Sequence, residues 1–268
     1  MQVRPHPAGA FDATTDAPSG GNYLIVGGNG HPVGREHHTR AQVDDLQRWA
    51  VQHFPGGELS HSWSAQDYEP AGAVPYVGAV PWSGNVHTAT GYNKWGMTNG
   101  VAAALALSAD ILGGDSSWAR ILFRTRISAH DAASTVQANN EVAVEMISGW
   151  LGGLARTRSV NPPEGQGVVV RDNGRPVGLC TVQGKSHKVS VICPHLGGVL
   201  GWNDAEQSWD CPLHGSRFTA DGQILEGPAT RELGHPVLCV AVFGGVGVFG
   251  RDEKGFLPRG LDLVSSAA

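Results

Sequence analysis

Four residues in one short stretch have the types and spacing of metal ligands. They occur as Cys193-x-His195 and, after fifteen intervening residues, Cys211-x-x-His214. Each pair offers one soft thiolate and one imidazole, so neither pair can complete a four-ligand site alone and two loops must come together. A proline after each cysteine stiffens its loop, and nearby glycines let the backbone approach the bound group. The stretch therefore predicts a metal centre built from two pre-shaped loops.

The ligand spacing bears on which metal is bound. Two cysteines with two histidines also form a zinc set, but structural zinc sites usually separate paired ligands by about two to five residues. Cys193-x-His195 is tighter than that. The spacing counts against zinc, although a non-catalytic scaffold held together by zinc stays as an alternative that metal analysis would distinguish.

The stretch closely resembles the Rieske iron–sulfur motif, Cys-x-His followed by Cys-x-x-His. In that family the two cysteines bind one iron of a [2Fe-2S] cluster and the two histidines bind the other. The resemblance implies that Cys193 and Cys211 hold the inner iron, and that His195 and His214 hold the outer, more exposed one. Further along, Gly227-Pro228-Ala229 is similar to the proline loop that covers the cluster in this family.

Two departures from the family pattern bear on the redox potential. High-potential Rieske proteins of respiratory complexes join the two loops by a disulfide, but Gly198 and Leu213 occupy those cysteine positions here. Those proteins also hydrogen-bond the cluster sulfurs with a serine and a tyrosine; Ser216 is kept, whereas Phe218 replaces the tyrosine. Because hydrogen bonds to cluster sulfur favour the reduced state, we expect a potential below those proteins and above plant-type ferredoxins.

A second region could bind an anionic or electron-rich ligand. A strand is predicted at 85–90, a glycine turn at 91–96 and an alanine-rich helix at 97–112. A turn that leads into a helix N-terminus presents free backbone N–H groups and the positive end of the helix dipole. The candidate ligand-binding residues are Gly91, Tyr92, Asn93, Lys94, Trp95, Gly96, Met97 and Thr98.

Residues from about 23 to 125 are similar to the C-terminal half of FAD-dependent oxidoreductases of the glycine/D-amino-acid oxidase group. The resemblance rests on Gly27-Gly28, His31, the segments 63–68 and 75–78, and the segment 89–100. Some members of that group carry a C-terminal Rieske domain, so the order of the parts also fits. The resemblance implies that Gly91 to Thr98 lie against the flavin ring.

The phosphate-binding half of that family is missing from these 268 residues. The only comparable glycine run, 27–30, has Val33 in place of the third glycine of G-x-G-x-x-G and Pro32 where the helix should begin. We therefore expect no tight FAD binding by this chain alone. The expected partner is a redox protein or the missing FAD-binding half, and the alternative is one half of a split flavin-dependent amine or amino-acid oxidoreductase.

Composition narrows the remaining classes. The net charge of −5 argues against nucleic acid or an anionic membrane as a partner. No window is apolar enough to span a membrane, and the N-terminus lacks the apolar core of a signal peptide. Cys180 and Cys239 lie in apolar runs and are expected to be buried free thiols. A cytoplasmic location is the simplest expectation.

The predicted elements organise the chain into five segments. We expect a tail at 1–20, an α+β partial flavoprotein-like domain at 21–127, a helical connector at 128–160, an all-β Rieske domain at 161–252 and a tail at 253–268. Strands are predicted at 23–26 and 59–63. One helix is predicted to begin at Thr39 as its N-cap, and another is predicted at 139–155. The strands predicted in the Rieske domain are 167–170, 176–182, 187–192, 237–242 and 246–249. The sequence thus predicts a soluble electron-transfer oxidoreductase component whose substrate it does not identify.

Overall fold

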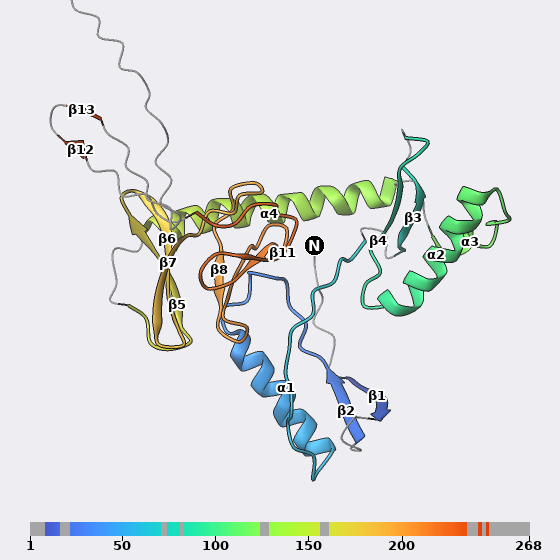
Figure 1. Ribbon diagram of the computed structural model, residues 1–268, viewed down its shortest axis with the longest axis horizontal. Coiled ribbons are helices and arrows are strands. Elements are labelled where there is room, and N and C mark those ends of the chain that lie inside the picture. Colours follow the sequence, from blue (N-terminus) through green and yellow to red (C-terminus); the bar gives the residue numbers. More distant parts are fainter. Residues whose placement is uncertain are drawn as a thin grey trace, which may run out of the picture. The chain divides into compact units, whose positions relative to one another are not determined.

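The computed structural model describes residues 9–16, 22–70, 74–80, 83–123, 129–155, 161–234, 241–242 and 245–246 (Figure 1). The residues up to Gly234 form one compact unit. Most of the predicted strands at 237–242 and 246–249, together with Cys239, lie outside the described residues. What is described there is a short antiparallel pair, β12 (Ala241–Val242) with β13 (Gly245–Val246).

The first sheet of the C-terminal part is a three-stranded antiparallel meander in the order β5-β6-β7. Its strands are β5 (Gly167–Asp172), β6 (Arg175–Val182) and β7 (Lys185–Ser190). Asn173-Gly174 and Gln183-Gly184 make the two hairpin turns, and all four residues have positive φ. Such turns match the twist of paired strands, which explains why these strands were predictable from the sequence.

A second, four-stranded sheet carries the loops of the metal-ligand stretch. Its order is β11-β10-β9-β8, from β8 (Gly201–Asn203), β9 (Ser208–Asp210), β10 (Arg217–Phe218) and β11 (Ile224–Glu226). The sequence did not predict these strands, since two or three residues are too few for an alternating pattern. Their role is positional, because β9 ends just before Cys211 and β10 begins just after Ser216.

The core of this part is continuous with the metal-ligand stretch. Cys193 and Cys211 belong to the same buried cluster as Val191, Trp209 and Phe218. At Gly178 of β6 a Cβ atom would lie 2.5 Å from the Val191 side chain and 2.6 Å from the Trp209 ring, so only glycine fits between them. The all-β character predicted for this part is confirmed.

The N-terminal part mixes helices and strands, as predicted. Its elements are β1 (Gly9–Asp16), β2 (Asn22–Gly27), α1 (Thr39–His53), β3 (Tyr76–Ala79), β4 (His87–Thr90), α2 (Gly96–Leu112) and α3 (Ala119–Leu122). A small core of Val77, Ala103, Ala106 and Phe123 joins the β3–β4 hairpin to α2. This core is separate from that of the C-terminal part.

Three local expectations for the N-terminal part are wrong. Residues 9–16, expected to be part of a loose tail, form β1 and pair with β2. Residues 59–63, expected as a strand, have no regular structure. The N-cap of α1 is His38 rather than Thr39, because the Thr39 hydroxyl instead donates to Asn203 Oδ1 at 2.7 Å.

Helix α4 (Ala129–Ala155) includes the helix predicted at 139–155 and begins earlier than predicted. Val142, Met146 and Trp150 pack against the core of the C-terminal part. At Gly153 a Cβ atom would lie 3.2 Å from the Pro176 side chain, so a small residue lets the helix approach β6. None of the helices that the structure describes is long and apolar enough to cross a membrane.

Candidate metal centre

The two loops that carry the predicted ligands have the same backbone construction. In the first loop the Cys193 N–H donates to Gly198 O at 2.8 Å and the Gly197 N–H donates back to Cys193 O at 2.9 Å. The second loop repeats this pattern, with Cys211 N to Ser216 O at 2.8 Å and Gly215 N to Cys211 O at 3.1 Å. The fifth residue of each loop is a glycine with positive φ, +76° at Gly197 and +79° at Gly215. Each loop is thus closed on itself by hydrogen bonds.

The structure brings all four predicted ligands together. The His195 and His214 rings lie with centroids 5.0 Å apart and nearly perpendicular, at 83°. The Cys193 and Cys211 side chains are hydrogen-bonded to each other and buried. The histidines lie further out, since His195 is exposed and His214 is half-buried. Two inner sulfurs and two outer imidazoles are the ligand order that the Rieske resemblance implies.

Several atoms of these side chains suit a bound cationic group. His214 Nδ1 is buried and has no hydrogen-bond partner, a costly state for a ring nitrogen unless something else occupies its lone pair. The hydrogen bond from Cys211, aided by Ser216, lowers the pKa of the Cys193 thiol to about 6. The same hydrogen bond between the two cysteines raises the pKa of Cys211, and burial lowers the pKa of His214. One ready thiolate and a neutral imidazole are the forms that bind metal.

No group of three His, Cys, Asp or Glu side chains converges on a single ion anywhere in the described parts of the chain. A structural zinc ion needs four such ligands at one point. A [2Fe-2S] cluster gives each iron only two protein ligands, so its four ligands are spread around a larger group. The residues present therefore fit a two-iron cluster better than zinc.

Ser216 links the centre to the proline loop. Its side chain is fully buried and hydrogen-bonds the Cys193 sulfur. Its hydroxyl oxygen also accepts from the Ala229 N–H at 3.0 Å. Ala229 follows the cis Gly227-Pro228 bond, in the segment similar to the covering loop of Rieske proteins. One hydroxyl thus fixes both a sulfur and the loop.

The places of the absent disulfide and tyrosine are filled by apolar side chains. A Cβ atom at Gly198 would lie 2.5 Å from Leu213 Cδ1, so the leucine occupies the space of the bridge. Leu213 and Phe218 are both buried in the core that contains the two cysteines. Packing replaces a covalent link and a hydroxyl donor here, and both substitutions keep water away from the sulfurs.

Helix α4 and the N-terminal part hold the two loops from outside, and sequence reasoning missed these contacts. Trp150 Nε1 of α4 donates to Gly197 O at 3.0 Å in the first loop. On the second loop, Arg35 Nε donates to Pro212 O at 3.0 Å and Gln66 Nε2 donates to Gly215 O at 2.9 Å. These partners are 47 to 177 residues apart and leave no local pattern in a sequence, so only the resemblance of 63–68 to a known family marked that segment.

The predicted flavin-contact residues form the turn at the start of α2. Gly91 is buried with φ of +79°, and a Cβ atom there would lie 2.9 Å from Pro70. Asn93 and Lys94 also have positive φ, and the Asn93 N–H donates to Tyr68 O at 3.3 Å. Tyr92 packs against the small N-terminal core, while Met97 at the helix start is 90% exposed. The turn has the tight backbone expected.

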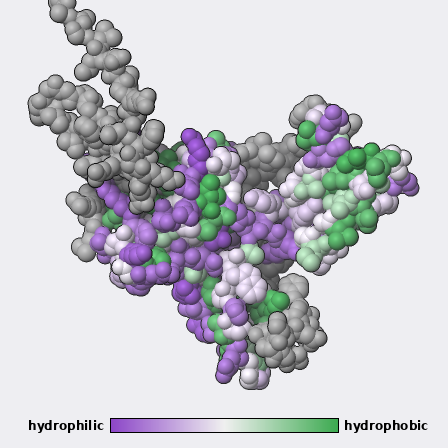
Figure 2. Space-filling model, viewed as in Figure 1, coloured by the Kyte–Doolittle hydropathy of each residue, from purple (hydrophilic) through white to green (hydrophobic). Residues whose placement is uncertain are grey.

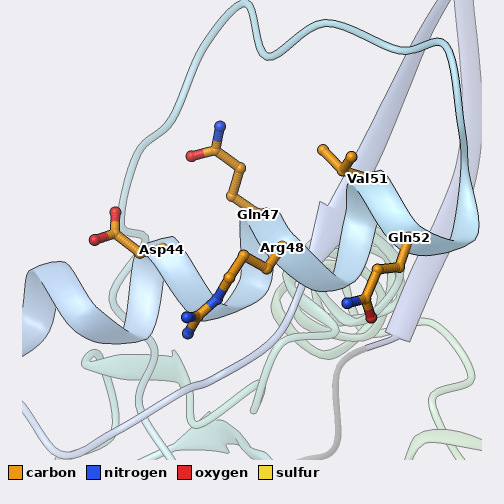
Figure 3. Close-up of a pocket in the computed structure, with 5 residues that line it drawn as sticks. All are labelled: Asp44, Gln47, Arg48, Val51 and Gln52. Carbon is orange, nitrogen blue, oxygen red and sulfur yellow. The ribbon is translucent and has the colours of Figure 1, made fainter.

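A surface hollow beside α1 is unrelated to these sites. Its lining consists of Asp44, Gln47, Arg48, Val51 and Gln52, all from one helix (Figure 3). None of the predicted ligand-binding residues contributes to it.

Comparisons with known proteins agree with both resemblances. Residues 154–243 match the family of the Rieske [2Fe-2S] domain, and residues 3–109 match the family of FAD dependent oxidoreductases. The protein YhfW of Bacillus subtilis (strain 168), a candidate Rieske 2Fe-2S iron-sulfur protein, is 31% identical over 219 residues, which are 80% of this chain and 43% of YhfW.

Other matches cover shorter stretches of the chain. The cytochrome b6-f complex iron-sulfur subunit of Chlorobaculum tepidum is 38% identical over 66 residues, 25% of this chain and 36% of that protein. The crystal structure of the plasma membrane Rieske protein PetC3 from Synechocystis PCC 6803 covers 31% of this chain and 86% of its own, with 27% identity and a TM-score of 0.25. The chain spans less than half the length of these curated relatives. It joins a Rieske [2Fe-2S] domain to part of an FAD-dependent oxidoreductase.

Proposed function

We propose that this chain is an electron-transfer oxidoreductase component whose [2Fe-2S] cluster is held by Cys193, His195, Cys211 and His214. The observation that carries the proposal is the meeting of two loops of identical construction, with their thiols in contact and their imidazoles 5.0 Å apart. When bound, such a cluster accepts or releases one electron at a time.

The chain's own residues shape the surroundings of that chemistry. Leu213 and Phe218 bury the two cysteines, so the sulfurs are kept from water and oxidants. His195 and the neighbouring Leu196 are exposed, which gives a redox partner an approach on the histidine side alone. The Ser216 hydroxyl donates to the Cys193 sulfur, and this hydrogen bond stabilises negative charge on that sulfur.

The test is an EPR spectrum of the dithionite-reduced protein with iron, sulfide and zinc analysis on the same sample. We expect two irons and two sulfides per chain and a rhombic signal of mixed Cys/His ligation. Cys193→Ala should abolish the signal, whereas Cys180→Ala should keep it, because Cys180 is a buried free thiol on β6 outside the loops. Zinc without sulfide would contradict the proposal and support a structural scaffold.

For the N-terminal part, we propose an FAD-binding half as the partner. Large apolar side chains on α2 are exposed, and Figure 2 shows hydrophobic surface gathered there; the residues are Met97, Val101, Leu105, Ile111 and Leu112. This favours a second candidate function, one half of a split flavin-dependent amine or amino-acid oxidoreductase. The surface lies on the same helix whose first turn resembles a flavin-contact segment.

Co-expression with a candidate FAD-binding chain tests this partner. We expect a co-purifying complex with flavin absorption, and Leu105→Asp should break the complex because it puts a charge in the buried interface. Val144→Asp, on an exposed position of α4, is the matched control. Loss of the complex in neither variant would contradict the α2 surface as the contact.

We also propose a cytoplasmic location. It is supported by Cys180, Cys193 and Cys211, which are unpaired among the described residues, as is usual in a reducing compartment. Cell fractionation with an antibody to the chain tests it, and recovery in a membrane or secreted fraction would contradict it.

A further inference from the structure

Gln66 is the residue through which the oxidoreductase part of the chain reaches the ligand loops. It lies in the irregular segment 54–70 that follows α1, within the residues matched to FAD dependent oxidoreductases. Its Nε2 donates to the carbonyl oxygen of Gly215 at 2.9 Å, and Gly215 directly follows His214. The other side-chain atom, Gln66 Oε1, is buried and has no hydrogen-bond partner among the described residues.

The contact is tight as well as polar. A Cβ atom added at Gly215 would lie 2.5 Å from Gln66 Nε2, so the absence of a side chain at Gly215 is what lets the amide reach the backbone. Gly215 also donates to Cys211 O, which means that Gln66 holds the ring of hydrogen bonds around the second loop. Removing the Gln66 amide would therefore free the buried Gly215 carbonyl from its restraint and also remove a partial positive charge beside the loop.

The same segment continues to the predicted flavin turn. Two residues beyond Gln66, Tyr68 O accepts from the Asn93 N–H at 3.3 Å. One short stretch of backbone therefore connects the turn at 91–98 with the loop that carries Cys211 and His214. Arg35 makes a second contact with this loop, but its guanidinium is shared with Glu141 of α4, so it links the loop to the connector instead.

We propose that Gln66 is a positioning residue of the cluster, by which the FAD-dependent oxidoreductase part sets the geometry and the redox potential of the second ligand loop. The donated hydrogen bond places positive partial charge beside the His214 loop, and this favours the reduced state. The inference rests on the proposed cluster and assigns to the N-terminal part a role in tuning it.

Two variants separate this role from packing. Gln66→Leu keeps the volume and removes the donor, while Gln66→Glu keeps the shape and adds a negative charge at neutral pH. Ser64→Ala is the matched control, because Ser64 lies on the same segment and donates to Glu206 Oε1 rather than to a ligand loop. Each purified protein is analysed for iron and sulfide, titrated by EPR for its midpoint potential, and heated to measure its Tm.

At a fixed ambient potential, we expect Gln66→Leu to lower the ratio of reduced to oxidised cluster about threefold, a fall of about 30 mV for one electron. Gln66→Glu should lower it further, and both should shift the EPR g-values, whereas Ser64→Ala should leave the potential unchanged. A wild-type protein that contains neither iron nor sulfide would contradict the proposed function itself. An intact cluster with equal potentials in wild type and both Gln66 variants, even with a lower Tm, would overturn only the role given to Gln66.

Discussion

Ser216→Ala is the substitution whose two effects the structure separates most clearly. The Ser216 hydroxyl is fully buried, donates to the Cys193 sulfur and accepts from the Ala229 N–H at 3.0 Å. Alanine removes both bonds and leaves almost no change in volume. The variant should therefore alter the potential through the sulfur and the stability through the Ala229 N–H.

The size of each effect follows from the bond that is lost. A hydrogen bond to a charged acceptor is worth about 1.5–3 kcal/mol, and we take about 1 kcal/mol as the difference between the two oxidation states. Since a tenfold change of a one-electron couple is about 59 mV and about 1.4 kcal/mol, the potential should fall by about 40 mV. The unsatisfied Ala229 N–H should lower the free energy of unfolding by about 1–3 kcal/mol.

The assay is an EPR-monitored redox titration beside thermal unfolding of the same samples. Ser208→Ala is the control, because Ser208 is equally buried but its hydroxyl bonds Asp210 and Arg217 and neither of the cysteine sulfurs. The control should lose stability and keep its potential. If Ser216→Ala retained its iron and its potential stayed within about 10 mV of the wild type, a scale well below the shift expected from the lost bond, then Ser216 would not tune the cluster.

Three further substitutions or conditions test the surroundings of the centre. Phe218→Tyr should raise the potential by about 40 mV, measured by the same titration, if its hydroxyl donates to a cluster sulfur. The double variant Gly198→Cys with Leu213→Cys should form a disulfide where the leucine now fills the space. Compared with its own reduced form, the variant should have two fewer titratable thiols and a free energy of unfolding higher by about 3 kcal/mol. Burial raises the pKa of Cys180 to about 11, so very little thiolate forms at pH 8. Iodoacetamide should therefore leave Cys180 unmodified at pH 8 in the folded protein and label it after unfolding, and rapid native labelling would contradict this.

The meeting of the four candidate ligands was predictable because each pair lies within one short stretch of sequence. Cys193-x-His195 and Cys211-x-x-His214 each lie within a single loop, and backbone hydrogen bonds close each loop on itself. The strands β5 to β7 were predictable for the same reason, since each of their hairpin turns is formed by two adjacent residues. Helix α1 follows from the spacing of its apolar residues and α2 from its alanine content, and they end at His53 and Leu112.

The sequence could not show which residues of the N-terminal part contact the C-terminal part. Thr39 has the type of a helix cap, yet its hydroxyl serves Asn203 and Asp204 of the C-terminal part. A Cβ atom at Gly34 would lie 2.6 Å from Pro212 N, so this glycine lets the N-terminal chain touch the second ligand loop. Such pairings depend on backbone positions more than 160 residues apart, and no period or motif in one chain encodes them.

These contacts change how the N-terminal part should be understood. Its small core joins β3 and β4 to α2 and needs nothing from the Rieske domain, whereas the stretch from Gly34 to Gln66 has contacts with 203–215 in place of a core of its own. That stretch would lose its ordered partners if the chain were cut at the connector. The second ligand loop would in turn lose the hydrogen bonds from Arg35 and Gln66. A Rieske domain expressed alone should therefore hold its cluster less firmly than the full chain, and iron retention on dilution with a chelator is the measurement that compares them.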